Sequence, residues 1–114
     1  MSRHDPLVRL RHMLDFSEQA IRLMGERSRE EFVSNELLLL GQARLVEMIG
    51  EAANRVPREI QEALPDIPWV DVIGMRHRLI HGYDTANIDK IYDVVVQDLQ
   101  VLVRSLKDYL SSHA

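Results

Sequence analysis

The amino-acid sequence predicts an all-α fold, an up-and-down bundle of four main helices with a short extra helix. Apolar residues recur at intervals of three and four nearly throughout the chain, which is the periodicity of amphipathic helices. Aromatic residues make up only 5% of the chain and no stretch alternates apolar and polar residues for long, so strand signals are nearly absent. A length of 114 residues fits one domain, which we expect to span residues 1–114.

Composition and charge exclude several classes of protein. With no cysteine, the chain can form neither disulfides nor thiolate metal sites, and we expect a cytoplasmic location. The longest apolar run, Leu37 to Leu40, is far shorter than the ~20 residues that cross a bilayer, and the N-terminus shows no apolar signal core, so we expect no membrane partner. A net charge of −4 argues against a surface that is basic everywhere but leaves room for a local basic cleft.

Capping signals mark the first helix. Asp5 is a preferred N-cap, and Pro6 suits the first helical position because its missing N–H has no partner there. Gly25 is expected to end this helix. Ser28 and Glu31 have capping-box spacing and indicate a short turn.

A second long helix is expected to begin at Ser34 or Asn35 and to end near Arg55. Gly41 and Gly50 lie inside it, and a glycine costs about 1 kcal/mol in a helix interior. We therefore expect each glycine to mark the close approach of another helix. The residues predicted to face the core are Leu37, Leu38, Leu40, Leu45, Ile49, Ala52, Ala53 and Val56.

Two further long helices follow. Residues 58–64 lie between two prolines and are expected to form two turns. Pro68 opens a third long helix over residues 69–81, and Gly82 follows as a residue that can adopt the left-handed conformation that ends a helix. Asn87 is expected to cap the last helix. The apolar stripe of that helix comprises Ile91, Val95, Leu99, Leu102, Leu106 and Leu110.

The segment over residues 74–83 contains residue types that suit phosphodiester chemistry. Imidazole can give or take a proton near neutral pH, because its ordinary pKa is about 6.5. Guanidinium is always charged and binds phosphate oxygens in a bidentate fork. Two residues of each type fall within six positions, namely Arg76, His77, Arg78 and His81.

The spacing of Arg76, His81 and Tyr83 forms an R-x4-H-x-Y motif. In this motif the chain resembles the HEPN ribonucleases, in particular the HepT toxins that are paired with MntA-type nucleotidyltransferase antitoxins. The run Gly50-Glu51-Ala52-Ala53, the pair Pro68-Trp69 and the run Gly74-Met75-Arg76 also resemble that family, so the similarity covers nearly the whole chain.

The resemblance implies an endoribonuclease toxin that needs neither a metal nor another cofactor. By the resemblance, Arg76 would hold the scissile phosphate of the RNA and His81 would act as general acid or base. Tyr83 would be adenylylated by an MntA-like nucleotidyltransferase antitoxin, which would silence the toxin. The sequence does not identify which RNA is cut.

The positions of the motif residues around their helix predict a homodimer. Arg76 and His81 are five residues apart, or about 140° around an ideal helix, so they do not stack on one face. A symmetric dimer that places two copies of this helix end together would bring guanidinium and imidazole onto one phosphate. The small residues Gly41, Gly50, Ala52 and Ala53 are candidates for close helix contact in that dimer.

A metal site is the main alternative for the histidines. His77 and His81 have the i, i+4 spacing of metal ligands, and Glu47 or Glu51 could supply a third ligand. The chain has no Glu-x-x-His pair, and we favour His77 as a solvated surface residue and no metal site. If His81 has no catalytic role, the dipole of the helix C-terminus favours it there.

The remaining supporting candidates are Arg78 and Glu51. Glu51 could pair with Arg76 or Arg78 or contact a partner, although it could equally be a plain surface carboxylate. The alternative function is a non-catalytic helical binding partner of a nucleotidyltransferase, which RNA cleavage by the purified protein would exclude.

Overall fold

The computed structural model describes residues 5–113, and every regular element in that range is helical. This confirms the all-α fold, although it contains two short helices besides the long ones. The predicted domain of residues 1–114 also includes residues 1–4 and 114, which lie outside the described range. The elements are α1 (Pro6–Met24), α2 (Arg29–Val33), α3 (Glu36–Asn54), α4 (Arg58–Ala63), α5 (Trp69–Ile80), α6 (Thr85–Asp93), a π-helical turn (Val94–Asp98) and α7 (Leu99–His113).

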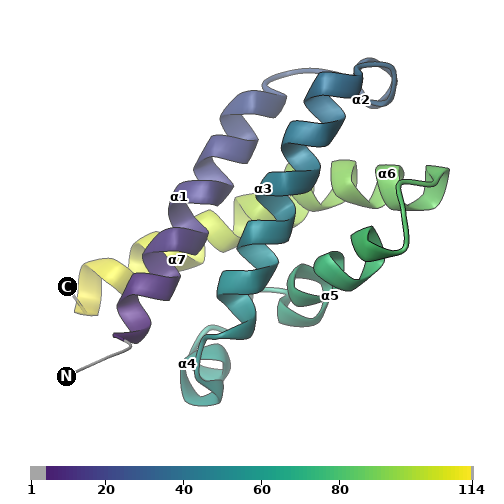
Figure 1. The fold of residues 1–114 in the computed structure, drawn as a ribbon. Helices are drawn as coiled ribbons and strands as arrows, with labels where there is room; N and C mark the ends of the chain where they lie inside the picture. The colour runs from purple at the N-terminus through teal and green to yellow at the C-terminus, as the bar shows by residue number, and fades with distance from the viewer. Residues whose placement is uncertain (1–4, 114) are drawn as a thin grey trace.

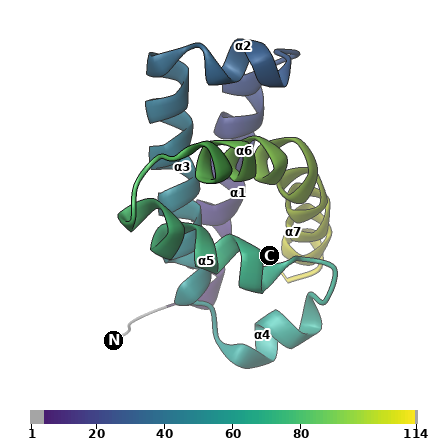
Figure 2. The ribbon, with the colours of Figure 1, turned by 90° about the vertical axis from the view of Figure 1, so that its right-hand side faces the viewer.

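The long helices pack around a single hydrophobic core. Helices α1 and α3 lie side by side and run in opposite directions, and α5 packs against α3 (Figure 1). Helix α6, the π-helical turn and α7 follow one another without a break and run across the α1–α3 pair (Figures 1 and 2). None of the helices in residues 5–113 is long and apolar enough to cross a membrane.

The expected ends of the first helix are confirmed. The Asp5 carboxylate accepts a hydrogen bond from the Leu7 amide at 2.9 Å, and Pro6 is the first helical residue. Gly25 follows the last helical residue with a φ of 57°, a conformation that residues with a Cβ rarely adopt. Ser28 and Glu31 form the expected capping box, which opens α2.

The inner face of α3 differs from the prediction at two leucines. Leu37 is 82% exposed and Leu40 is also exposed, whereas Leu38 and Leu39 are buried. Four consecutive leucines cover every side of a helix, so their pattern alone cannot show which side faces the core. The contacts of α3 with α1 and α5 determine which leucines face the core, and they also turn Gln42 inward. The cap is Asn35, whose side chain accepts from the Leu38 amide.

Gly50 marks a close approach of two helices, as expected. A Cβ atom at Gly50 would lie 2.8 Å from the backbone oxygen of Val72 in α5. At Gly41 the nearest atom belongs to the flexible side chain of Leu23, at 3.4 Å, so the backbones are not forced together there. The expectation that the small residues of α3 contact a second protomer is wrong for three of them. Gly50, Ala52 and Ala53 are buried within the chain itself.

The start of the last helix was also predicted wrongly. Asp84, not Asn87, is the N-cap of α6, and its carboxylate accepts from the Asn87 amide at 2.8 Å. Both residue types cap helices well, and the sequence offers both within one turn. The apolar stripe is confirmed, since its residues from Ile91 to Leu106 are buried and Leu110 packs against them. The π-helical turn, in which the Leu99 amide donates to the Val94 carbonyl, was not expected.

Candidate active site

The C-terminal end of α5 presents the motif residues to solvent. Val72, Met75 and Leu79 form the buried stripe of this helix, which fixes the directions of the other side chains. The helix ends at Ile80, and Gly82 takes a φ of 118° in the turn that follows. The left-handed conformation expected there is therefore present.

Arg76 is held at the α3–α5 contact by an ion pair. Its Nε lies 3.7 Å from Glu51 Oε2, and Oε1 of the same carboxylate lies 3.6 Å from the Arg55 guanidinium. Glu51 thus pairs with Arg76, which was one of its two predicted arginine partners. All three side chains are about half exposed, so water screens these pairs and the arginines can exchange them for another anion.

A small hollow lies beside this pair. Its volume is about 220 Å³, and Arg76 and His77 are the charged or titratable groups that line it. Ile80, which is 65% exposed, forms an apolar wall, so the hollow can seat the apolar part of a ligand beside a phosphate-binding group. The other lining residues are Gly50, Asn54 and Ile73.

His77 and His81 lie edge to face, with ring centroids 4.7 Å apart. His77 lines the hollow and His81 does not, but the His81 ring touches that of His77. His77 is exposed, as expected, and it lines the hollow together with Arg76 while its ring contacts that of His81. In residues 5–113 no group of three or more histidine, aspartate or glutamate side chains could hold a metal ion, and Glu51 is occupied by arginines.

Tyr83 and Arg78 are both exposed near the end of α5. The Tyr83 side chain is exposed in the turn between α5 and α6. The Arg78 side chain is exposed as well, while its carbonyl accepts a hydrogen bond from the His81 amide. Both side chains are therefore accessible to a ligand or a partner.

Asn87 holds the motif turn in place, and the sequence analysis missed this role. Its side chain, only 8% exposed, donates to the Gly82 carbonyl at 2.8 Å and to the Arg78 carbonyl at 3.0 Å. These two carbonyls lie on either side of His81 along the chain. A signal was available, because Asn87 falls on the same stripe as Ile91 and Val95, and a polar group on a buried face needs partners.

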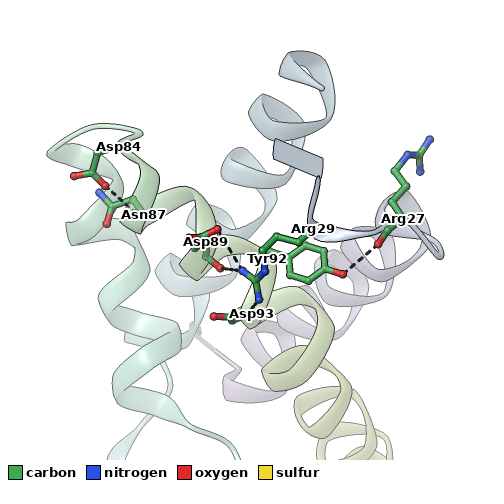
Figure 3. A network of polar contacts seen from close by, with 7 residues as sticks. All are labelled: Arg27, Arg29, Asp84, Asn87, Asp89, Tyr92 and Asp93. Carbon is green, nitrogen blue, oxygen red and sulfur yellow. Dashed lines mark hydrogen bonds and ion pairs between the residues drawn. The ribbon is translucent and has the colours of Figure 1, made fainter. Parts of the chain in front are cut away.

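A second polar network fixes the other end of α6 (Figure 3). The Arg29 guanidinium of α2 lies 2.7 Å from Asp93 and 3.4 Å from Asp89, and it covers the Tyr92 ring at 4.6 Å. The Tyr92 hydroxyl donates to the Arg27 carbonyl. Helix α6 is thus attached to α2 at one end and, through Asn87, to the motif turn at the other.

An all-helical bundle that presents an arginine and two neighbouring imidazoles at one helix end has groups suited to phosphodiester chemistry. Residues 13–109 match the family described as "Ribonuclease HepT-like", and the chain belongs to this family. The resemblance found in the sequence is thereby confirmed.

Several relatives carry names that match this family. "Putative RNase TTE0752" of Caldanaerobacter subterraneus subsp. tengcongensis is 32% identical over 105 residues, which is 92% of this chain and 94% of the relative. "Putative RNase MJ1216" of Methanocaldococcus jannaschii is 34% identical, covering 88% of this chain and 94% of its own length. "Probable ribonuclease HepT" of Thermococcus cleftensis is 31% identical, and the match covers 74% of this chain and 80% of the relative. No solved structure gives a significant match.

Proposed function

We propose that this protein is an endoribonuclease toxin that cuts RNA without a metal ion, with Arg76 on the scissile phosphate and His81 as general acid or base. The observation that carries the proposal is the end of α5, where Arg76 and His77 line one hollow and the His81 ring contacts that of His77, in a chain of the HepT-like ribonuclease family. Membership in this family supports RNA as the substrate.

The proposed reaction uses the ribose 2′-hydroxyl as nucleophile. An imidazole removes the proton of that hydroxyl, whose oxygen forms a new bond to phosphorus as the bond to the 5′-oxygen breaks. The leaving 5′-oxygen takes a proton from a protonated imidazole, so the products are a 2′,3′-cyclic phosphate and a 5′-hydroxyl. The internal hydroxyl is already next to the phosphate, and this proximity supplies much of the rate. Arg76 neutralises the charge on the non-bridging oxygens, and His77 supports it from the same hollow.

A homodimer would complete this site. Along α5, Val70 is 86% exposed and Ile80 is 65% exposed, and a Cβ at Gly74 would meet no atom within 4 Å. A second copy packed on this surface would cover exposed apolar side chains and bring Arg76 of one protomer toward His81 of its partner. Light scattering at micromolar concentration tests this assembly, and a monomer that cuts RNA at full rate would contradict it.

Tyr83 is the proposed target of an MntA-like nucleotidyltransferase antitoxin. Its exposed phenol oxygen would attack the α-phosphorus of ATP, releasing pyrophosphate and losing its proton to solvent. The attached AMP would occupy the space and the positive charge that RNA needs. Intact mass after co-expression with the antitoxin should show added AMP, whereas Tyr83→Phe should show none and Tyr109→Phe should match wild type. Full modification of Tyr83→Phe would place the target elsewhere.

Cleavage of RNA by purified variants tests the chemistry. His81→Ala should lower the rate by about 10²–10⁴, the usual contribution of a positioned acid or base. Arg76→Ala should also lower the rate strongly, because the scissile phosphate loses the guanidinium that binds it. Arg76→Lys should retain partial activity, because an ammonium cannot form the bidentate fork. His113→Ala, an exposed histidine near the end of α7, is the matched control and should cleave like wild type.

The conditions of the assay separate the alternatives. Activity should survive EDTA, and the products should carry cyclic phosphate ends. Metal-dependent cleavage that leaves 5′-phosphates would contradict the proposal and favour His77 and His81 as metal ligands. No cleavage of any RNA, together with tight binding to the nucleotidyltransferase, would favour a non-catalytic binding partner.

A further inference from the structure

A basic groove runs between α1 and α3, outside the residues assigned to catalysis. It encloses about 270 Å³, and three arginines line it in a chain whose net charge is −4. We call it the α1–α3 groove. Its lining consists of Arg9, His12, Phe16, Arg44, Met48, Glu51, Ala52 and Arg55.

The groove continues into a second hollow of about 430 Å³. The two hollows share Arg9 and Arg55, and the second is completed by Pro6 and Pro57. The concave surface therefore extends along α1 toward its N-terminal end. It is longer than a site for a single small anion needs to be.

The arginines of the groove are available to an external anion. Arg44 pairs with Glu47 at 3.0 Å and Arg55 with Glu51 at 3.6 Å, but each arginine side chain is more than half exposed. Within residues 5–113, Arg9 forms no ion pair. Exposed pairs of this kind contribute little to stability, so phosphate oxygens can replace the carboxylates.

Aromatic rings lie among these charges. The rings of His12 and Phe16 are 6.2 Å apart and tilted by 44°, and Met48 adds an apolar surface in the same hollow. Proteins that bind single-stranded nucleic acid combine arginines along the backbone with aromatic faces on which bases stack. The α1–α3 groove has both kinds of side chain.

Glu51 connects the groove to the candidate active site. It lines the groove, and its carboxylate contacts Arg55 on the groove side and Arg76 on the α5 side. A strand whose phosphate lies on Arg76 would therefore meet Arg55 next and then enter the groove. We propose that the α1–α3 groove binds the single-stranded RNA that flanks the scissile phosphate, an inference that rests on the proposed function.

Binding is measured by fluorescence anisotropy with a labelled 2′-O-methyl oligouridine, which cannot be cut by attack of a 2′-hydroxyl. The test variant is Arg9→Gln/Arg44→Gln, which leaves the Glu51 pairs intact. The control is Arg22→Gln/Arg104→Gln, which removes the same charge at exposed positions outside the groove. Loss of two phosphate contacts should reduce the slope of log affinity against log salt by about 1.4.

The control should keep the wild-type slope. Phe16→Leu should weaken binding roughly tenfold by removing a stacking face, with little change in the slope. Equal losses of affinity in the test and control variants would overturn the proposal, because they would reflect overall charge alone.

Cleavage kinetics give a second readout. For a long RNA the test variant should raise KM with kcat unchanged, whereas a dinucleotide too short to reach the groove should be cut as by wild type. If wild type cuts no RNA, the proposed function fails, while the anisotropy measurement still decides whether the groove binds RNA. A test variant that binds RNA normally but loses adenylylation by the antitoxin would overturn the inference and make the groove a protein interface.

Discussion

Alanine at Gly50 and alanine at Gly74 should change stability in opposite directions. Both glycines lie inside helices, so alanine gains about 1 kcal/mol of helix propensity at either position. At Gly74 a Cβ would meet no atom within 4 Å, so nothing offsets the gain. Gly74→Ala should therefore raise the free energy of unfolding by about 1 kcal/mol.

At Gly50 the same gain is outweighed by a clash. The new Cβ would lie 2.8 Å from the Val72 oxygen, and ordinary contact begins at 3.4 Å, so the helices would have to separate by 3.4 − 2.8 = 0.6 Å. The clashing atom belongs to the backbone, so α5 would have to move rather than one side chain. Overpacking typically costs 1–3 kcal/mol, and we expect about 2–3 kcal/mol here. The net loss of about 1–2 kcal/mol corresponds to a fall in Tm of roughly 4–8 °C.

Calorimetry and urea denaturation of the two variants measure these changes. Gly50→Ala should also slow RNA cleavage, because separating α3 from α5 changes the hollow that Gly50, Arg76 and His77 line. If Gly50→Ala is as stabilising as Gly74→Ala, the two backbones do not touch and the reasoning fails. If Gly74→Ala is less stable than wild type, the space beside Gly74 is not open and the reasoning fails.

Three further substitutions test individual side chains. Asn87→Asp keeps the shape of the side chain but removes both hydrogen-bond donors, so the free energy of unfolding, measured in urea, should fall by roughly 2–3 kcal/mol. RNA cleavage should also become slower, because the Gly82 turn loosens. An unchanged free energy of unfolding would contradict this prediction. Asp84→Ala removes the N-cap of α6 and should lower the free energy of unfolding by about 1 kcal/mol. An unchanged free energy of unfolding would argue against that role of Asp84. Burial raises the pKa of the Asp98 carboxyl, an effect that Lys90 opposes. The native state then binds a proton more readily than the unfolded chain, so the stability due to Asp98 falls as pH rises through the interval between the ordinary and the raised pKa. Asp98→Asn should raise Tm at pH 7 and lose that gain below the ordinary aspartate pKa, whereas a gain independent of pH would refute the assignment.

Helix ends were predictable because their signals are local. The Asp5 cap, the stop at Gly25 and the left-handed turn at Gly82 each depend on a few neighbouring residues. The motif residues at the end of α5 could be selected for the same reason, since they are close in the sequence. The contact between the His77 and His81 rings follows from their spacing of one turn.

Features that depend on contacts between helices were not predictable in the same way. The run Leu37–Leu40 is apolar on every side, so only packing shows that Leu37 faces solvent. Asn87 and Asp84 are both good caps, and the choice between them depends on carbonyls at the end of α5 that Asn87 reaches. The small residues of α3 indicated a close contact correctly, but only the structure identifies α5 of the same chain as the partner.

The π-helical turn at Val94–Asp98 has a consequence for how α6 and α7 can vary. A π turn accommodates one residue more than an α turn, and its five residues cover about the same angle as four residues of a regular α-helix. The Arg29 contacts of α6 and the packing of α7 on α1 are therefore both kept although the chain carries an additional residue between them. Deleting one residue from this turn would restore a regular α-helix and leave α7 facing nearly the same way. A deletion in the middle of α7 would instead rotate the rest of that helix by about 100°, so the turn should tolerate the loss of a residue better than α7 does.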